Sequence, residues 1–181
     1  MDINEYNKRV GRAIVTVEEI AEGVKRAGKY IDEIYDGRPI LLVSILKGSF
    51  VFLADVARAV TVPCEIGFMC AKSYYAGTES TGAVKITMDL DQDIKDYHVV
   101  IIEDIVDSGR TLSQVVDILR QRSPLSLRVL TLLDKPSRRA VDFTADLALF
   151  TIPDYFVIGY GLDCAEYYRN LKYVAEYNRE I

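Results

Sequence analysis

Histidine is almost absent from this chain, because its 181 residues include only His98. This excludes zinc sites built on three histidines and the paired histidines of the His-Glu-x-x-His motif. A Ser-His-Asp triad would have to use His98, which opens an apolar run over residues 98–102. A polar residue at the edge of a strand is the simpler interpretation of that position.

Cysteine is also scarce, and its arrangement argues against a disulfide framework or a thiolate metal site. The residues Cys64, Cys70 and Cys164 are odd in number and show no Cys-x-x-Cys spacing. We therefore expect three reduced thiols in a reducing compartment, the cytosol.

Long apolar runs and an excess of positive charge are missing as well. The start of the chain, residues 1–5, is acidic and lacks the basic and apolar regions of a signal peptide, and no apolar run approaches the ~20 residues that cross a bilayer. The formal net charge is −5, which disfavours broad binding to nucleic acid. We expect a soluble cytoplasmic protein with neither a nucleic-acid nor a membrane partner.

Short apolar runs alternate with stretches of helical periodicity along the chain, whose length corresponds to about one domain. Continuous apolar runs are typical of strands covered on both faces. Their alternation with helices predicts an α/β fold, a mostly parallel twisted sheet flanked by helices, with ligands beyond the carboxyl ends of the strands. The predicted strands span 40–45, 62–71, 83–88, 99–102, 127–133 and 156–159, and the predicted helices span about 16–35, 50–59 and 111–121.

The most informative segment follows the predicted strand 99–102. Two adjacent carboxylates come first, then a short loop with glycine and hydroxyl side chains opens a helix. Backbone N–H groups at a helix start attract phosphate, and glycine lets the backbone approach a ligand closely. Carboxylates only accept hydrogen bonds, which suits the vicinal hydroxyls of a ribose. These features favour a ribose 5-phosphate site over an ordinary capped turn. The residues concerned are Glu103, Asp104, Asp107, Ser108, Gly109, Arg110 and Thr111.

Three other polar segments lie at the ends of predicted strands, and each allows two interpretations when taken alone. Residues 44–49 contain a Lys-Gly pair that could bind an anion or form a plain turn with a solvated lysine. Residues 72–82 could form a mobile lid or a long hairpin loop. Lys135 and Phe156 could contact a ligand, or be a solvated lysine and a core aromatic residue.

Taken together, these segments resemble the type I phosphoribosyltransferases, and more narrowly the hypoxanthine-guanine phosphoribosyltransferases. Residues 102–111 match the family's signature for phosphoribosyl pyrophosphate (PRPP), and Tyr168-Arg169-Asn170-Leu171 matches its C-terminal motif. The resemblance covers about residues 10–173. Cys164, often aromatic in the family, and Lys172, often proline in bacterial members, are minor departures.

The resemblance implies a domain layout and a reaction. The layout is one domain over residues 1–181, with a flap at about 73–82 and a small hood from about 1–15 and 153–181. The reaction joins hypoxanthine or guanine to PRPP, gives IMP or GMP and pyrophosphate, and uses Mg²⁺. Family members are usually homodimers or homotetramers, so a homo-oligomer is expected.

The resemblance also implies roles for individual residues. Asp107 is expected to act as the general base at the N7 edge of the purine. Lys135 is expected to donate to the 6-oxo group, which would exclude adenine because an ammonium cannot accept a hydrogen bond. The resemblance assigns pyrophosphate binding to Leu46, Lys47, Gly48 and Arg169, and the Leu46–Lys47 peptide is often cis in the family. It assigns purine binding to Lys135, Phe156, Val157 and Asp163. It places Ser73 and Tyr74 in the flap, and it gives Glu103, Asp104 and Asp163 as the Mg²⁺ ligands.

Three alternatives keep the same fold. One is a regulatory protein that binds RNA and nucleotides, which the acidic charge and the Lys135–Phe156 purine set disfavour. Another is an inactive subunit, which would be expected to lack one of the acids at 103, 104 or 107. The third is an orotate or adenine phosphoribosyltransferase, which the flap segment and the Lys135 segment disfavour.

Overall fold

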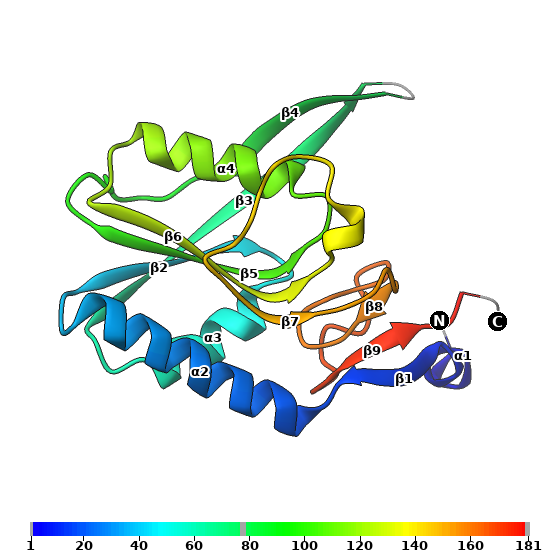
Figure 1. Cartoon of the computed structure of the whole chain (residues 1–181). Coiled ribbons are helices and arrows are strands. Elements are labelled where there is room, and N and C mark those ends of the chain that lie inside the picture. The colour runs from blue at the N-terminus through cyan, green and yellow to red at the C-terminus, as the bar shows by residue number, and fades with distance from the viewer. Residues whose placement is uncertain (1, 77–78, 180–181) are drawn as a thin grey trace.

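A six-stranded sheet forms the centre of the molecule (Figure 1). The computed structural model describes residues 2–76 and 79–179, without the side chains of 73–76 and 79–83. The sheet order is β4-β3-β2-β5-β6-β7, and every neighbouring pair is parallel except the antiparallel β3–β4 hairpin. The strands are β2 (Ile40–Leu46), β3 (Cys64–Ala76), β4 (Glu79–Met88), β5 (His98–Val106), β6 (Ser126–Asp134) and β7 (Leu147–Thr151).

Helices cover both faces of this sheet, as the continuous apolar strands predict. Helices α2 (Val17–Tyr35) and α3 (Phe50–Ala59) lie on one face, and α4 (Arg110–Gln121) lies on the other (Figure 1). Thr16 begins α2 with a capping box, in which its hydroxyl accepts from the Glu19 N–H while the Glu19 carboxylate accepts from the Thr16 N–H. The α/β architecture with a mostly parallel sheet is therefore confirmed.

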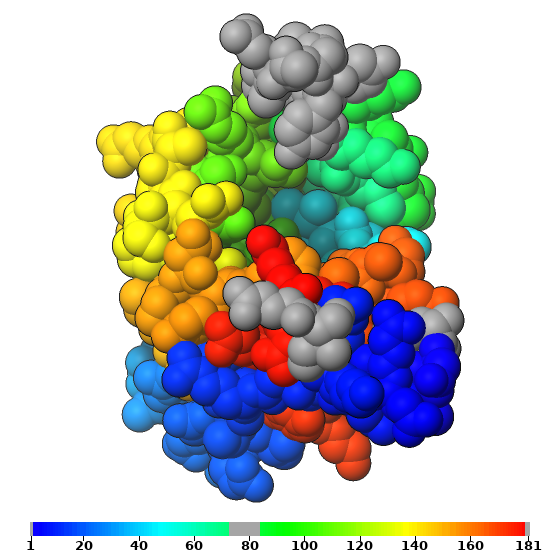
Figure 2. Space-filling model, turned by 90° about the vertical axis from the view of Figure 1, so that its right-hand side faces the viewer, coloured from blue at the N-terminus to red at the C-terminus, as the bar shows by residue number. Residues whose placement is uncertain are grey.

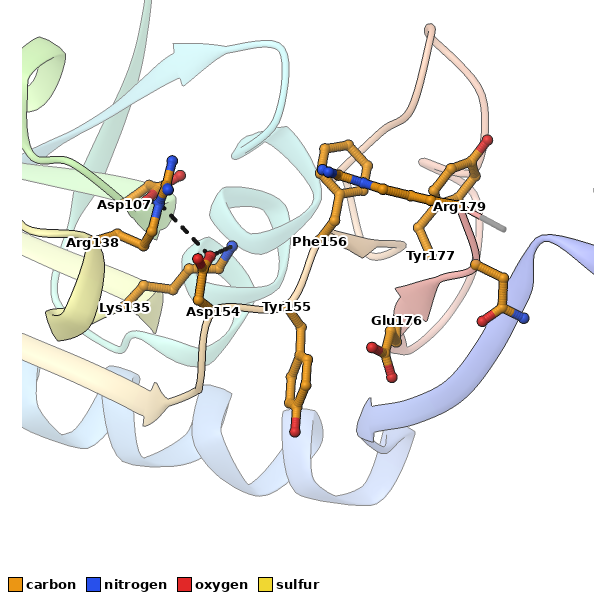
Figure 3. Close-up of a pocket in the computed structure, with 10 residues that line it drawn as sticks. Asp107, Lys135, Arg138, Asp154, Tyr155, Phe156, Glu176, Tyr177 and Arg179 are labelled. Carbon is orange, nitrogen blue, oxygen red and sulfur yellow. Dashed lines mark hydrogen bonds and ion pairs between the residues drawn. The ribbon is translucent and has the colours of Figure 1, made fainter. Parts of the chain in front are cut away.

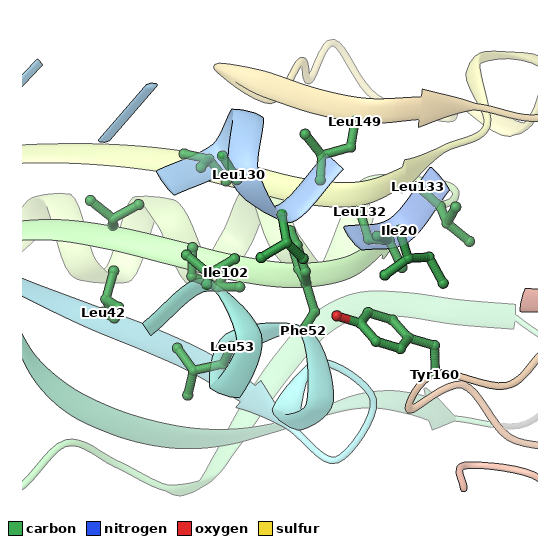
Figure 4. Close-up of a cluster of buried hydrophobic side chains, with 14 of the residues drawn as sticks. Ile20, Leu42, Phe52, Leu53, Ile102, Leu130, Leu132, Leu133, Leu149 and Tyr160 are labelled. Carbon is green, nitrogen blue, oxygen red and sulfur yellow. The ribbon is translucent and has the colours of Figure 1, made fainter. Parts of the chain in front are cut away.

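Two hydrophobic clusters hold the layers together. Between the sheet and the α2–α3 layer, Ile20, Phe52 and Leu53 pack against Leu42 and Ile102 of the strands (Figure 4). The second cluster joins the opposite face to α4 through buried valine, leucine and isoleucine side chains. Because β2 and β5 are apolar on both faces, the polar residues that follow them are held at a rigid edge.

A second, three-stranded sheet lies beyond the carboxyl ends of the main strands and forms the hood (Figure 1). Its order is β1-β9-β8, and both pairings are antiparallel. The strands are β1 (Val10–Val15), β8 (Val157–Ile158) and β9 (Val174–Tyr177), and α1 (Ile3–Lys8) precedes β1. The two ends of the chain thus build one element together.

Several predicted boundaries were wrong. Strand β5 continues to Val106, so Glu103 and Asp104 lie within it rather than after it. The predicted strand 156–159 does not join the main sheet, because its residues form β8 within the hood that the resemblance implies, and the unpredicted β7 takes the sheet edge. Much of the polar segment 72–82 extends β3 and β4, with residues 77–78 outside the described part.

Three further expectations from the sequence can be compared with the structure. Cys64, Cys70 and Cys164 are all free thiols, as predicted. Across the described ranges 2–76 and 79–179, no helix is long and apolar enough to span a bilayer. His98 begins β5, and its Nδ1 lies 2.8 Å from the Ser126 hydroxyl, in agreement with its interpretation as a strand-edge residue.

Candidate active site

A cavity of about 290 Å³ opens where β2 and β5 end and α4 begins. We call it the strand-end cavity. One wall is the segment Leu46–Gly48, whose Leu46–Lys47 peptide bond is cis, as the resemblance implies. The other wall is the end of β5 with the loop that leads into α4. Two segments that are distant in the sequence therefore meet because β2 and β5 are parallel neighbours.

Two carboxylates line the strand-end cavity: Asp104 is buried, and Glu103 is half-buried with its Oε2 atom buried. Burial raises the pKa of Asp104 to about 6, and it raises the pKa of Glu103 well above the usual range, with the Asp104 charge adding to the effect. Within the described part of the chain, the buried Oε2 of Glu103 has no hydrogen-bond partner. Few contacts offset the negative charge of these two carboxylates. The pair therefore favours a cation or a hydroxyl group as its ligand.

The Asp104 carboxylate leaves room for no residue other than glycine at position 48. A Cβ atom added to Gly48 would collide with Oδ2 of Asp104, and one added to Gly161 would collide with the Gly48 carbonyl oxygen. The 46–48 segment is therefore held between the β5 carboxylate and the hood loop, with no room for side chains at these two positions.

The start of α4 forms the remaining wall of the strand-end cavity. Gly109 is its N-cap residue with a φ of 78°, a left-handed conformation that glycine adopts without strain. Because glycine has no side chain to cap the helix, the helix start stays open to an anionic ligand. The Ser108 hydroxyl and Thr111 lie at the same place, and both residues line the cavity.

A second, larger cavity of about 830 Å³ lies between the main sheet and the hood (Figure 3). We call it the hood cavity. Lys135 and Phe156 line it, together with residues from β9 and the chain after it. Asp107 lines both cavities, so it stands where they meet. In the space-filling view, the surface is hollowed between the green and cyan segments and the orange and red ones (Figure 2).

Ion pairs occupy the inner side of the hood cavity (Figure 3). Lys135 is only 5% exposed, and its Nζ lies 3.9 Å from Oδ1 of Asp154. Arg138 places its Nε 3.2 Å from Oδ1 of Asp107 and 3.7 Å from Oδ1 of Asp154. Arg139 donates to the backbone carbonyl of Asp107. Asp107 is thus fixed by two arginines that follow Lys135 in the sequence.

The outer side of the hood cavity is aromatic. Phe156 is 38% exposed, and the guanidinium carbon of Arg179 lies 4.4 Å from the centre of its ring (Figure 3). Tyr177 meets the same ring edge-on at a centroid distance of 5.5 Å. A planar ligand stacked on the face that Arg179 covers would displace the Arg179 side chain.

A third group of charges lies at the hood loop, beside the 46–48 segment. The NH2 group of Arg169 lies 2.9 Å from Oδ1 of Asp163 and 3.1 Å from Oε2 of Glu166. Lys47 places its Nζ 3.0 Å from the same oxygen of Glu166. These contacts bring together the two cations that the resemblance assigns to pyrophosphate.

Some of the residues predicted for the purine and for the flap lie outside the two cavities. Asp163 sits with Arg169 and not in the hood cavity lining. The side chain of Val157 packs in the core, and its backbone pairs with Glu176 of β9. Ser73 and Tyr74 belong to β3, and their side chains lie outside the described part.

The donor set fits a divalent ion, although the three predicted ligands are not gathered into one ready-made site. Across the described residues, no three His, Cys, Asp or Glu side chains converge closely enough to hold a metal. Glu103 and Asp104 offer carboxylate oxygens, one of them buried without a partner. Because Mg²⁺ prefers oxygen ligands and keeps several waters, one or two carboxylates are enough.

Four charged residues that shape the site were not predicted. Arg138 ends the 3₁₀ helix Pro136–Arg138, Arg139 and Asp154 lie in loops, and Glu166 lies on a turn, all places where a charge is typical of solvated surface. The signals available were the adjacent arginines three and four residues after Lys135, and the acid between Asp163 and Arg169. Neither pattern has a spacing that distinguishes a partner from an exposed side chain.

Comparison with known proteins places this geometry in a family. A family model described as "Phosphoribosyl transferase domain" matches residues 12–165. The chain is 48% identical over 171 residues to the hypoxanthine phosphoribosyltransferase of Salmonella typhimurium, covering 93% of this chain and 96% of that protein. It is 42% identical over 172 residues to the hypoxanthine-guanine phosphoribosyltransferase of Streptococcus pneumoniae, covering 95% and 96%.

Solved structures agree with the sequence relatives. The crystal structure of a hypoxanthine phosphoribosyltransferase from Staphylococcus aureus superimposes with a TM-score of 0.92 at 40% identity, covering 98% of this chain and 97% of that one. The fold expected from the resemblance is thereby confirmed. This chain belongs to the phosphoribosyltransferase family, among the hypoxanthine and hypoxanthine-guanine phosphoribosyltransferases.

Proposed function

We propose that this chain transfers the 5-phosphoribosyl group of PRPP to hypoxanthine or guanine, giving IMP or GMP and pyrophosphate. In this reaction N9 of the base bonds to C1′ of the sugar, and the bond from C1′ to the pyrophosphate oxygen breaks. The observation that carries the proposal is the junction at Asp107 between the strand-end cavity and the hood cavity. One cavity suits a sugar phosphate, and the other suits a planar base.

The strand-end cavity holds PRPP in this proposal. The 5-phosphate binds at the start of α4, to the backbone N–H groups and hydroxyls of residues 108–111 with Arg110 beside them. Glu103 and Asp104 accept hydrogen bonds from the ribose hydroxyls. The pyrophosphate group lies at Leu46, Lys47 and Gly48, with Arg169 on the hood side.

The metal in this proposal is Mg²⁺, which Glu103 and Asp104 would hold, with Asp163 as a further candidate ligand. When bound, Mg²⁺ neutralises charge on the leaving pyrophosphate. The chain's own residues position the two substrates, and positioning with charge stabilisation accounts for most of the rate. The flap segment with Ser73 and Tyr74 would exclude water from the reacting carbon.

Asp107 acts as the general base in this proposal. It lies between the two cavities, so its carboxylate can reach a base bound in the hood cavity while the sugar is bound in the strand-end cavity. It takes the proton from the N7 edge of the purine as N9 bonds to C1′. Arg138 lies against Oδ1 of Asp107 and sets the direction of the carboxylate.

Lys135 and Phe156 select the base. Lys135 is buried and can only donate, so the 6-oxo group of hypoxanthine or guanine can accept from it, while the 6-amino group of adenine offers it no acceptor. Phe156 supplies a stacking surface, and the backbone at Val157 meets the purine edge. Adenine is therefore expected to be a very poor substrate.

An assay with hypoxanthine, guanine, xanthine and adenine in parallel tests the proposal. Each base is incubated with PRPP and Mg²⁺, and nucleotide and pyrophosphate are measured together. We expect IMP and GMP in equal amounts with pyrophosphate, and no activity without Mg²⁺. Absence of nucleotide from every base would overturn the proposed function, whereas efficient AMP formation would overturn the role of Lys135 alone.

For assembly and location we propose a cytoplasmic homodimer or homotetramer. The assembly is supported by a largely apolar hollow of about 640 Å³ between α2, α3 and residues 169–172, which exposed Val17 and Phe50 line. Light scattering on the purified protein tests the number of subunits, and a monomer at micromolar concentration would contradict it.

A further inference from the structure

One oxygen atom of Glu166 contacts two cations that belong to different segments. Its Oε2 lies 3.0 Å from Nζ of Lys47 and 3.1 Å from NH2 of Arg169. These are the two cations assigned to pyrophosphate in the proposed function. A single anionic oxygen between a lysine and an arginine is also the arrangement that a phosphate oxygen adopts. Glu166 therefore occupies the position of an anionic ligand.

The turn that carries Glu166 is built to present the carboxylate there. The backbone N–H of Glu166 donates to Oδ2 of Asp163 at 2.9 Å, and Glu166 itself has a left-handed φ of 70°. The position is set by the hood loop and not by chance contact of two flexible side chains.

The bond to Lys47 is nevertheless easy to break. The side chains of Lys47 and Glu166 are 65% and 64% exposed, and exposed ion pairs contribute little to stability. Arg169 is more buried and keeps a second acid, because its NH2 group also pairs with Asp163. Releasing Glu166 would therefore leave Arg169 in place while Lys47 becomes free to bind another anion.

We infer that Glu166 is a positioning residue that holds Lys47 and Arg169 in the empty site and yields them to the pyrophosphate group of PRPP. This inference rests on the proposed function, because it concerns how that site accepts its substrate. Glu166 keeps the 46–48 segment next to the hood loop before PRPP arrives. It also competes with bound pyrophosphate, which weakens binding of PRPP and speeds release of the product.

Two substitutions of Glu166 distinguish the effect of its direct contacts with Lys47 and Arg169 from the effect of its charge at long range. E166Q removes the negative charge, while E166D keeps it on a side chain one methylene shorter that no longer reaches both cations. Titration calorimetry with magnesium pyrophosphate is expected to show binding about 3- to 10-fold tighter for both variants. If E166D binds as the wild type does and only E166Q is tighter, the effect is long-range charge and the inference is wrong.

A matched control uses a glutamate that pairs with a lysine elsewhere. Glu22 lies 3.3 Å from Lys25 on α2 and is 67% exposed, so E22Q removes a comparable ion pair far from the pyrophosphate residues. We expect E22Q to bind pyrophosphate as the wild type does. Thermal unfolding of each variant checks that the fold is intact.

Steady-state kinetics provide a second measurement that a purely structural role would not change in this way. KM for PRPP should fall in E166Q and E166D, and pyrophosphate should inhibit at lower concentration, while binding of IMP, which lacks the pyrophosphate group, stays the same. Unchanged or weaker pyrophosphate binding in both variants would overturn the inference. A wild-type protein that forms no nucleotide from any base would instead overturn the proposed function.

Discussion

The strand-end cavity and the hood cavity adjoin at Asp107, yet they are built on different physical principles. The first is rigid, because two strands that are buried on both faces deliver its residues. Its acids Glu103 and Asp104 are buried with little compensation. The second cavity is lined by turns and by the hood, and its charged groups already pair with one another.

This difference indicates how each side recognises its ligand. The carboxylates of the strand-end cavity are unfavourably placed in the empty protein. A cation and the hydroxyl groups of a sugar would offset their charge, so ligand binding should stabilise the folded protein. The hood cavity is satisfied without a ligand, and a base must replace existing contacts such as that between Arg179 and Phe156. Substitutions should therefore affect PRPP on one side and the base on the other.

The largest effect is expected at the residue that both cavities share. D107N should lower kcat by about 10²- to 10⁴-fold, because the amide cannot take the purine proton. PRPP binding should remain close to that of the wild type, because the start of α4 is unchanged. Stopped assays with separate titrations of PRPP measure both quantities, and wild-type turnover in D107N would refute the assignment.

Gly48 tests the rigidity of the strand-end cavity. In G48A the new methyl group collides with the Asp104 carboxylate, so the 46–48 segment must shift. We expect kcat/KM for PRPP to fall by about 100-fold, the loss that misplacement of about 1 Å can cause. G37A is the control, since a Cβ at Gly37 meets no atom within 4 Å; it should change stability only. An active G48A would show that the segment adapts.

Asp104 should lower the stability of the empty protein. Its pKa is about 6 in the folded state against an ordinary value of 3.8, so the folded state binds the proton more tightly than the unfolded state does. Stability is therefore lost as pH rises from about 4 to above 6. D104N, neutral throughout, should be more stable by about 2–3 kcal/mol at pH 8 while losing activity.

Calorimetric unfolding in EDTA at pH 4.5 and pH 8 measures this effect. The Tm of D104N should exceed that of the wild type by about 4–10 °C at pH 8, and the two should converge at pH 4.5. D117N is a suitable control, because Asp117 is an exposed residue of α4. A lower Tm for D104N at pH 8 would mean that Asp104 is compensated in the empty site.

The smallest effect is expected at Asp154 in the hood cavity. Its Oδ1 faces both Lys135 and Arg138, but Asp154 is exposed and its pairs are long. D154N should raise KM for hypoxanthine by about 2- to 5-fold and leave KM for PRPP unchanged. Initial rates with each substrate varied in turn measure this. A shift confined to PRPP would contradict the division between the two cavities.

The two cavities also differ in how far the sequence predicted them. Around Asp107 the order of residues along the chain is enough to predict the site, because a buried strand, two acids, a glycine and a helix follow one another. The predicted residues of that segment do line one cavity, except for Arg110, which is exposed and outside its lining. The strand was nevertheless longer than predicted, since Glu103, Ile105 and Val106 continue its backbone pairing with β6. Polar residues were taken as the end of the strand, and tertiary pairing overrode that signal.

The hood side depends on contacts between distant segments, which no local pattern reveals. Strand β9 pairs with β1 across more than 150 residues, and β8 has only two residues. For this reason the apolar pattern alone grouped residues 156–159 with the strands of the main sheet, whereas the resemblance placed them correctly in the hood. The pairs of Arg138 with Asp154 and of Lys47 with Glu166 likewise join separate turns, where sequence alone shows only isolated charges.

The central position of β9 in the hood has a consequence for biosynthesis. Residues Val174–Tyr177 bridge β1 and β8, so neither of those strands has its hood partner until β9 has been synthesised and has left the ribosome. A nascent chain with all six main strands made already contains every segment that lines the strand-end cavity. The hood cavity, in contrast, also needs β9, so a chain that stops before Val174 would lose the hood cavity while keeping the main sheet.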